Sequence, residues 1–187
     1  MKKVVILALL MVSTFSFAQE TKKESKWVFG AGVNFIDNTS SGSNEYLNYS
    51  NWNATLGFSK LSLQYFYNTN LSVSSEFTIN KLGKDVDQNE KAIDANLSYF
   101  GFDLNARYNV AGLMKLPSKF AVEPILGLGN AWTSGNPNQS LNTGISLGYQ
   151  INETYGVRLQ TLGKFAAEKN TVGNNMIQHS LELYFKL

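Results

Sequence analysis

The sequence predicts an all-β fold, an eight-stranded antiparallel up-and-down transmembrane β-barrel, and three observations support this prediction. Apolar and polar residues alternate with a period of two in segment after segment, which is typical of strands with one apolar face. Only 16% of the 187 residues are charged, well below the ~25% of ordinary soluble domains. The alternating segments number about eight, and each is long enough to cross a bilayer when tilted.

The stretch Leu61–Asn80 shows the pattern most clearly. Its two halves both alternate, and Asn68, Thr69 and Asn70 between them are residues that favour a tight turn. In the second half, alternate residues share one face: Leu71, Val73, Ser75, Phe77 and Ile79. The stretch is therefore a predicted β-hairpin.

Eight strands of this kind are predicted in order along the chain: Trp27–Ile36, Trp52–Tyr67, Leu71–Lys81, Asp94–Val110, Phe120–Thr133, Leu141–Ile151, Tyr155–Phe165 and Asn175–Leu187. In the second strand the apolar residues change parity, so we expect one extra residue, a β-bulge, near Ser59 and Lys60. In the fifth strand Pro124 cannot donate a ladder hydrogen bond, so we expect a local irregularity there.

The predicted connections alternate in length. Long connections follow the odd-numbered strands: Asp37–Asn51, Leu82–Ile93, Ser134–Ser140 and Ala166–Asn174. Short turns follow the even-numbered strands, apart from Ala111–Lys119. In an outer-membrane barrel the long loops are extracellular and the short turns periplasmic, so we expect the long connections on the cell exterior and both termini at the opposite end.

Residues 1–18 are predicted to be a secretory signal peptide. Lys2 and Lys3 form a positive start, Val4–Val12 is apolar, and Ser16 and Ala18 place small residues before a cleavage site. The single barrel domain would then span residues 19–187. The chain contains no cysteine, which excludes disulfides and a lipid-modified cysteine. A net charge of +2 gives no indication of a nucleic-acid partner.

The facing of the strands distinguishes a membrane barrel from a soluble barrel of lipocalin type, whose apolar face points inward. Here the face opposite the apolar residues carries many glycines, which suits a narrow interior. The aromatic residues form two belts, as expected for anchoring at two membrane interfaces. The belt at the short-turn end contains Trp27, Tyr65, Tyr67, Tyr108, Phe120, Tyr149, Tyr155 and Phe185, and the other contains Phe35, Trp52, Phe77, Phe100, Trp132 and Phe165.

The signal peptide, the eight amphipathic strands and the last strand ending in Leu183–Leu187 resemble the small outer-membrane β-barrel family, whose familiar members are OmpX and the transmembrane domain of OmpA. The resemblance covers the whole mature chain and rests on pattern. The final residue of that family is usually aromatic, whereas here it is Leu187, with Phe185 two residues before it. The resemblance implies a location in the bacterial outer membrane, with lipid and other outer-membrane proteins as partners.

Catalytic chemistry has little support in the sequence. A barrel lipid A deacylase uses a His and a Ser two residues apart on one strand face, but here His179 is adjacent to Ser180, and neighbouring strand residues point to opposite faces. The sequence offers no metal cluster, phosphate loop or nucleophile elbow. We therefore predict no enzyme activity, no cofactor and no metal.

The polar face carries charges of both signs, with Lys60, Lys164 and Lys186 among the basic ones. The predicted lumen charge network consists of Glu76, Asp103, Arg107, Glu123, Arg158 and Glu182. Buried charges must pair to be tolerated, and Arg107 and Arg158 are the expected hubs because a guanidinium can serve two carboxylates. The sequence thus favours a non-enzymatic barrel with a filled lumen, structural or a subunit of an envelope assembly. The alternative is a narrow pore for small solutes or ions.

Overall fold

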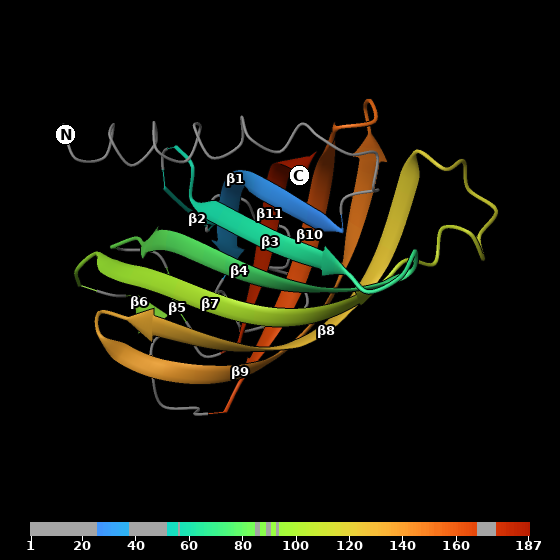
Figure 1. Cartoon of the computed structure of the whole chain (residues 1–187). Coiled ribbons are helices and arrows are strands. Elements are labelled where there is room, and N and C mark those ends of the chain that lie inside the picture. Colours follow the sequence, from blue (N-terminus) through green and yellow to red (C-terminus); the bar gives the residue numbers. More distant parts are fainter. Residues whose placement is uncertain are drawn as a thin grey trace.

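The computed structural model describes residues 26–37, 52–55, 57–84, 87–88, 91–92, 94–167 and 175–187, and these form a closed barrel of tilted antiparallel strands (Figure 1). The strands of its wall are β1 (Trp27–Asp37), β2 (Asn53–Ala54), β3 (Lys60–Phe66), β4 (Leu71–Leu82), β7 (Leu97–Tyr108), β8 (Phe120–Thr133), β9 (Asn136–Gln150), β10 (Tyr155–Ala166) and β11 (Met176–Lys186). Since β2 and β3 together occupy one place in the wall, the predicted eight-stranded barrel is confirmed. Within the described residues, no helix is long and apolar enough to span a membrane.

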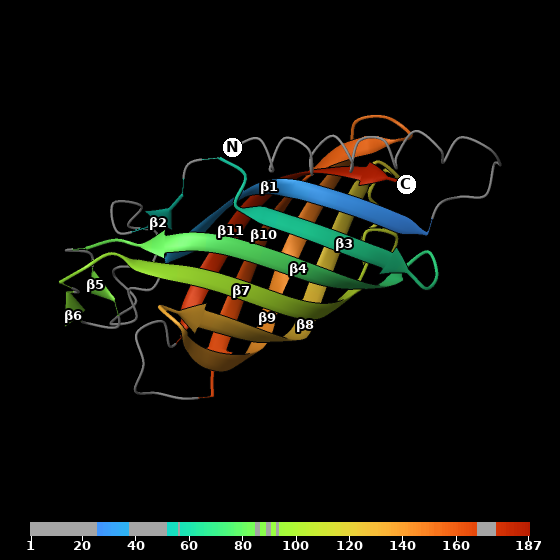
Figure 2. The same cartoon turned by 60° about the vertical axis from the view of Figure 1, so that its left-hand side comes forward.

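The barrel closes where the first long strand meets the last. Each long strand pairs with the next long strand along the chain, and the short β2 pairs with β1 beyond the end of β3. β11 returns to pair with β1 over ten residue pairs, from Val28–Lys186 to Asp37–Ile177. Figure 2 shows the start of β1, the C-terminus and the β3–β4 turn at the same end of the barrel. Closure removes the unpaired edge strands that an open sheet would present.

The two faces of the wall differ as the alternation predicts. Outward-facing leucines are strongly exposed, for example Leu126 at 60% and Leu128 at 68%, whereas the inward-facing Glu76 and Asp103 are completely buried. The apolar face therefore points away from the lumen, which is the arrangement of a membrane barrel and the reverse of a soluble one. Leucines exposed to this extent over a whole wall require an apolar surrounding.

The prediction of a long connection at Ser134–Ser140 is wrong. β8 continues to Thr133 and β9 begins at Asn136, so only Ser134 and Gly135 connect them. Both residues have positive φ, 47° and 89°, the geometry of a two-residue hairpin turn that matches the strand twist. The dipeptide Ser-Gly was the available sequence signal for this turn.

The other long connections differ less from their predicted bounds. Leu82 belongs to β4, and a small hairpin of β5 (Asp87–Gln88) and β6 (Lys91–Ala92) interrupts the segment before β7. Most of the predicted connections 37–51 and 166–174, and the predicted signal peptide, lie outside the described residues. The exterior position of the long connections stays a prediction.

The predicted bulge in the second strand is larger than one residue. Between the pairs Gly32–Lys60 and Phe35–Ala54, β1 advances three residues while the opposing segment advances six. The segment therefore contains three extra residues, with Gly57 at a positive φ of 91°. An odd number of extra residues reverses parity, which is why the sequence pattern located the irregularity but not its length.

Side-chain amides hold the wall together beyond this bulge. Among the described residues, the backbone bonds between this segment and β4 end with Ile79 N donating to Ser59 O at 2.9 Å. Further along, Asn80 Nδ2 donates to Asn53 O at 3.1 Å and to Asn34 Oδ1 at 2.9 Å. Gly83 N donates to Asn53 Oδ1 at 2.6 Å. We call Asn34, Asn53 and Asn80 the amide seam, because they replace part of a backbone ladder.

The first prediction concerns this seam. Asn80→Ala removes three donated bonds, two to the oxygens of Asn34 and one to Asn53 O, and the loss of this buried donor should cost about 1–3 kcal/mol of folding free energy. Hydrogen exchange of detergent-solubilised protein should accelerate in the last residues of β4 and not in β9 or β10. The matched control is Asn136→Ala at the exposed start of β9. Unchanged exchange in β4 would contradict a structural role for the seam.

Candidate functional site: the charged interior of the barrel

The interior brings together eight charged side chains, each no more than 4% exposed. Period-two alternation on six strands directs these residues inward. Four are basic and four acidic among the residues that the structure describes: Lys60, Arg107, Arg158 and Lys164, with Glu76, Asp103, Glu123 and Glu182. Equal numbers of the two signs allow each of these eight interior charges an opposite partner.

Arg107 on β7 lies at the centre of the larger cluster. Its Nη2 is 2.5 Å from Glu76 Oε1 and its Nη1 is 3.2 Å from Glu123 Oε2. Nε donates to Ser74 Oγ at 2.9 Å, and Nη2 also donates to Gln160 Oε1. The planar guanidinium thus connects two carboxylates on different strands, which a lysine could not do with the same geometry.

Lys60 on β3 makes the other short ion pairs of this cluster. Its Nζ lies 2.8 Å from Glu76 Oε2 and 3.3 Å from Glu182 Oε1. Arg158, the second hub expected from the sequence, is 3.9 Å from Glu123 and 4.0 Å from Glu182. Its short contact is a hydrogen bond to Gln64 Oε1, and its buried Nη1 has no hydrogen-bond partner among the described residues. Lys60 therefore connects the carboxylates more directly than Arg158 does.

A smaller cluster lies around Lys164 on β10. Lys164 Nζ is 2.7 Å from Asp103 Oδ2 and donates to Tyr99 OH at 3.3 Å. Asn142 Nδ2 donates to Asp103 Oδ1 at 2.8 Å and to Asn105 Oδ1 at 3.4 Å, and Asn105 Nδ2 donates to Glu76 Oε1 at 2.9 Å. These amides connect the two clusters, so the charges form one continuous polar network across the barrel.

The structure therefore places all six predicted network residues inside and brings five of them into the larger cluster. Asp103 instead pairs with Lys164. Lys60 and Lys164 were recognised in the sequence as polar-face residues but were not assigned to the network. Which residues form ion pairs depends on which strands are neighbours around the barrel. The inward direction of a side chain, which alternation predicts, does not reveal its partner. Lys186, also on the predicted polar face, is exposed at the end of β11.

Small residues let the polar side chains approach one another. A Cβ on Gly30 would overlap Ser62 Oγ and Glu182 Oε2, and these two atoms are themselves joined by a hydrogen bond of 2.6 Å. A side chain at this position would therefore displace the carboxylate from Lys60. Glycine on the inner face is required here for close approach.

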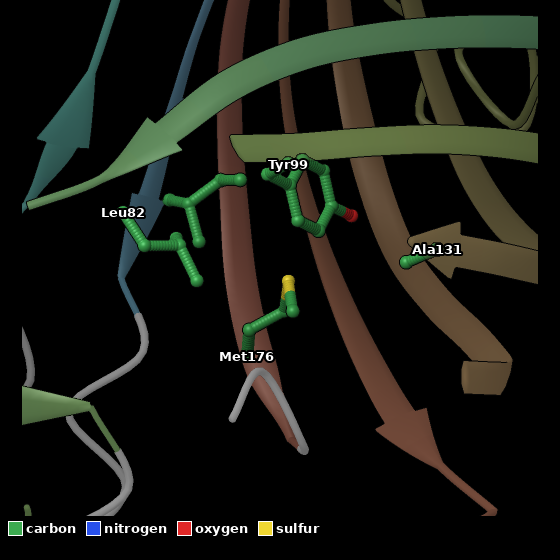
Figure 3. Close-up of a cluster of buried hydrophobic side chains, with 5 residues drawn as sticks. Leu82, Tyr99, Ala131 and Met176 are labelled. Carbon is green, nitrogen blue, oxygen red and sulfur yellow. The ribbon is translucent and has the colours of Figure 1, made fainter. Parts of the chain in front are cut away.

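An apolar cluster covers the charges at the end of the barrel opposite the start of β1 and the C-terminus. Ile36, Leu82, Tyr99, Ala131 and Met176 are buried together, with Leu97 packed against them. Figure 3 shows Leu82, Tyr99 and Met176 pointing toward one another from different strands, with Ala131 beside them. Alternation alone marked this inner face as polar, so the cluster was missed. Tyr99 joins the two zones, because its ring lies in the cluster and its hydroxyl accepts from Lys164.

Pairs of aromatic rings lie on the outer wall near both ends, whereas Tyr99 and Tyr184 are buried. At the end that holds the start of β1 and the C-terminus, Trp27 packs with Tyr65, Phe120 with Tyr149 and Tyr155 with Phe185, at ring-centroid distances of 4.8, 5.1 and 6.2 Å. At the other end Phe100 contacts both Phe77 and Trp132, and Phe35 contacts Trp52. The rings of neighbouring strands pack against one another, so each belt consists of groups of contacting rings around the barrel.

His179 and Ser180 occupy opposite faces of β11. His179 is on the outer wall, where its Nδ1 shares a hydrogen bond of 3.0 Å with Thr161 Oγ1 and its ring stacks on Trp52 at 4.6 Å. Ser180 is inside and accepts from Lys60 at 3.0 Å. The two side chains cannot act on one substrate. Among the described residues, no three metal-binding side chains of the His, Cys, Asp and Glu types lie together.

A closed eight-stranded barrel with an apolar outer wall and a polar interior is the fold of small bacterial outer-membrane proteins. Solved structures that share it include Neisserial surface protein A, at 18% identity and a TM-score of 0.56, covering 87% of this chain and 98% of that chain. The N-terminal barrel domain of OprF from Pseudomonas aeruginosa matches at 11% identity and a TM-score of 0.52, covering 87% and 98%. Ail from Yersinia pestis matches at 12% identity and a TM-score of 0.50, covering 88% and 99%. No protein-family model and no curated protein matches the sequence.

The second prediction separates the two arginines. Arg107→Ala leaves Glu123 without a short ion pair and removes one partner of Glu76, so it should cost about 3–5 kcal/mol of folding free energy. Arg158→Ala should cost only about 1–2 kcal/mol, since Glu182 keeps Lys60 and Glu123 keeps Arg107. Denaturant titration of the barrel folded in lipid vesicles measures both.

A double variant checks the cause of this difference. Adding Glu123→Gln to Arg107→Ala removes the stranded charge and should recover part of the loss, a non-additivity expected for residues in contact. Equal losses for the two single arginine variants, or strict additivity in the double variant, would contradict the central position of Arg107.

Proposed function

We propose that this protein is a non-enzymatic outer-membrane barrel with a closed lumen, acting structurally or as a subunit of a larger envelope assembly. The observation that carries the proposal is the pairing inside the barrel. Four cations and four anions occupy the interior and are linked by ion pairs and amide hydrogen bonds. A network of this kind stiffens a wall and fills its centre.

The same arrangement is poorly suited to conduction. Selective pores present rings of one charge sign, or carbonyls that replace the hydration shell of an ion. Here opposite charges face each other at 2.5–3.3 Å in the tightest pairs. Beyond them the apolar cluster of Ile36, Leu82, Tyr99, Ala131 and Met176 covers one end. An ion would have to break these pairs and then cross an apolar layer.

The absence of enzyme activity is part of the proposal. The sole histidine is on the outer wall and its neighbouring serine is bonded inside the lumen. The interior carboxylates are occupied by lysine and arginine, so none is free to act as a base toward a substrate. These contacts support a role in which the protein acts through its outer surface and its binding partners. They give no support to catalysis inside the barrel.

The third prediction tests the closed lumen. Purified, folded protein inserted into a planar bilayer should show no steady conductance, because water and ions could cross only if the ion pairs and the apolar cluster opened. Arg107→Ala should produce brief, flickering openings, because it releases Glu123 from its short ion pair and removes one partner of Glu76. Lys186→Ala, which removes an exposed charge at the end of β11, is the matched control and should stay silent. Large, stable channels from the unmutated protein would refute the closed lumen and favour the narrow pore.

A further inference from the structure

The outer wall carries a shallow groove over β7, β8 and β9. Two adjoining hollows of about 260 and 270 Å³ make it up, and both are lined by Asn130 and Gln139. The remaining side chains along it are mostly apolar: Phe102, Leu104, Leu128, Pro137 and Ala167. The groove is therefore polar at one point and apolar along the rest of its length.

The polar point consists of two carboxamides side by side. Asn130 on β8 and Gln139 on β9 are direct cross-strand partners. Among the outward-facing wall residues whose side chains the structure describes, they are the two with carboxamide groups. Asn130 Oδ1 is buried with no hydrogen-bond partner among the described residues, and the side chains of Asn130 and Gln139 both line the groove. An amide N–H facing lipid requires an acceptor.

The position of the amides relative to the aromatic belt indicates their depth. Trp132 is two residues beyond Asn130 on the same face of β8, and Phe165 pairs with Leu141, two residues from Gln139. The amides thus lie close to the belt, where the polar linkage of a lipid meets its acyl chains. Leu104 and Leu128, cross-strand partners of each other, lie further from the belt toward the middle of the wall.

We propose that this groove binds one ester-linked bilayer lipid. An acyl chain lies along Leu104 and Leu128, and a linkage carbonyl accepts hydrogen bonds from the side-chain N–H groups of Asn130 and Gln139. The carbonyl is the acceptor that a lipid offers at this depth, and the leucines offer the apolar contact that its chain requires. The inference depends on the outer wall and the belt, and it is independent of whether the lumen conducts.

The decisive experiment compares two lipids that differ only in the linkage. The folded protein is placed in bilayers of diacyl phosphatidylcholine or of its dialkyl ether analogue, which lacks the carbonyls, and the lipids retained after detergent stripping are counted by native mass spectrometry. We expect one retained lipid per barrel with the ester form. Retention should fall about tenfold with the ether form, as for the loss of one or two hydrogen bonds.

Two variants and a matched control locate the site. Leu104→Trp fills the groove and should abolish retention, whereas Leu159→Trp places the same ring at an equally exposed wall position, 52% against 51%, and should leave it intact. Asn130→Leu combined with Gln139→Leu should make the ester and ether lipids equivalent. Heat-dependent gel mobility verifies that each barrel is folded.

Three results would overturn the proposal. They are the loss of all lipid from the unmutated protein, equal retention of ester and ether lipids by it, and equal retention by the two tryptophan variants. The first two need no variant, so the test stands even where a substitution prevents folding. If the number of retained lipids depended on the phosphate headgroup and did not depend on the ester linkage, the site would bind a different ligand chemistry and the proposal would be wrong.

Discussion

The narrow interior of an eight-stranded barrel is the constraint on which the rest of this structure depends. Such a barrel has room for side chains and little else, so any charge that alternation directs inward must find an opposite charge there. Arg107 and Lys60 meet this requirement by each contacting two carboxylates. The small residues around them, such as Gly30, follow from the same lack of space.

The wall is completed in two different ways. Over most of the circumference the backbone ladder joins neighbouring strands, and β11 pairs with β1 to remove the edge. Where three extra residues interrupt the second strand, the amide seam of Asn34, Asn53 and Asn80 supplies the bonds. A buried backbone group needs a partner in either case, and asparagine side chains supply it at this interruption.

Carboxamides have opposite surroundings on the two sides of this wall. Inside, Asn105, Asn142 and Gln160 donate hydrogen bonds to carboxylates of the charge network and connect it across strands. Outside, Asn130 and Gln139 stand near the aromatic belt with apolar neighbours, where the surrounding lipid is the available partner. The same chemical group therefore stabilises the barrel on one face, and on the other it is the polar part of the proposed lipid site.

The sequence by itself determined the fold class and the facing of the strands, because period-two alternation is a local property. It also placed Glu76, Arg107 and Glu182 inside. Only the tertiary structure decided that Lys60 makes shorter ion pairs with the carboxylates than Arg158 does, and that Lys164 pairs with Asp103. It also decided that Ile36, Leu82 and Met176 pack together in an apolar cluster. These partners come from strands far apart in the chain, and barrel closure and register set their contacts.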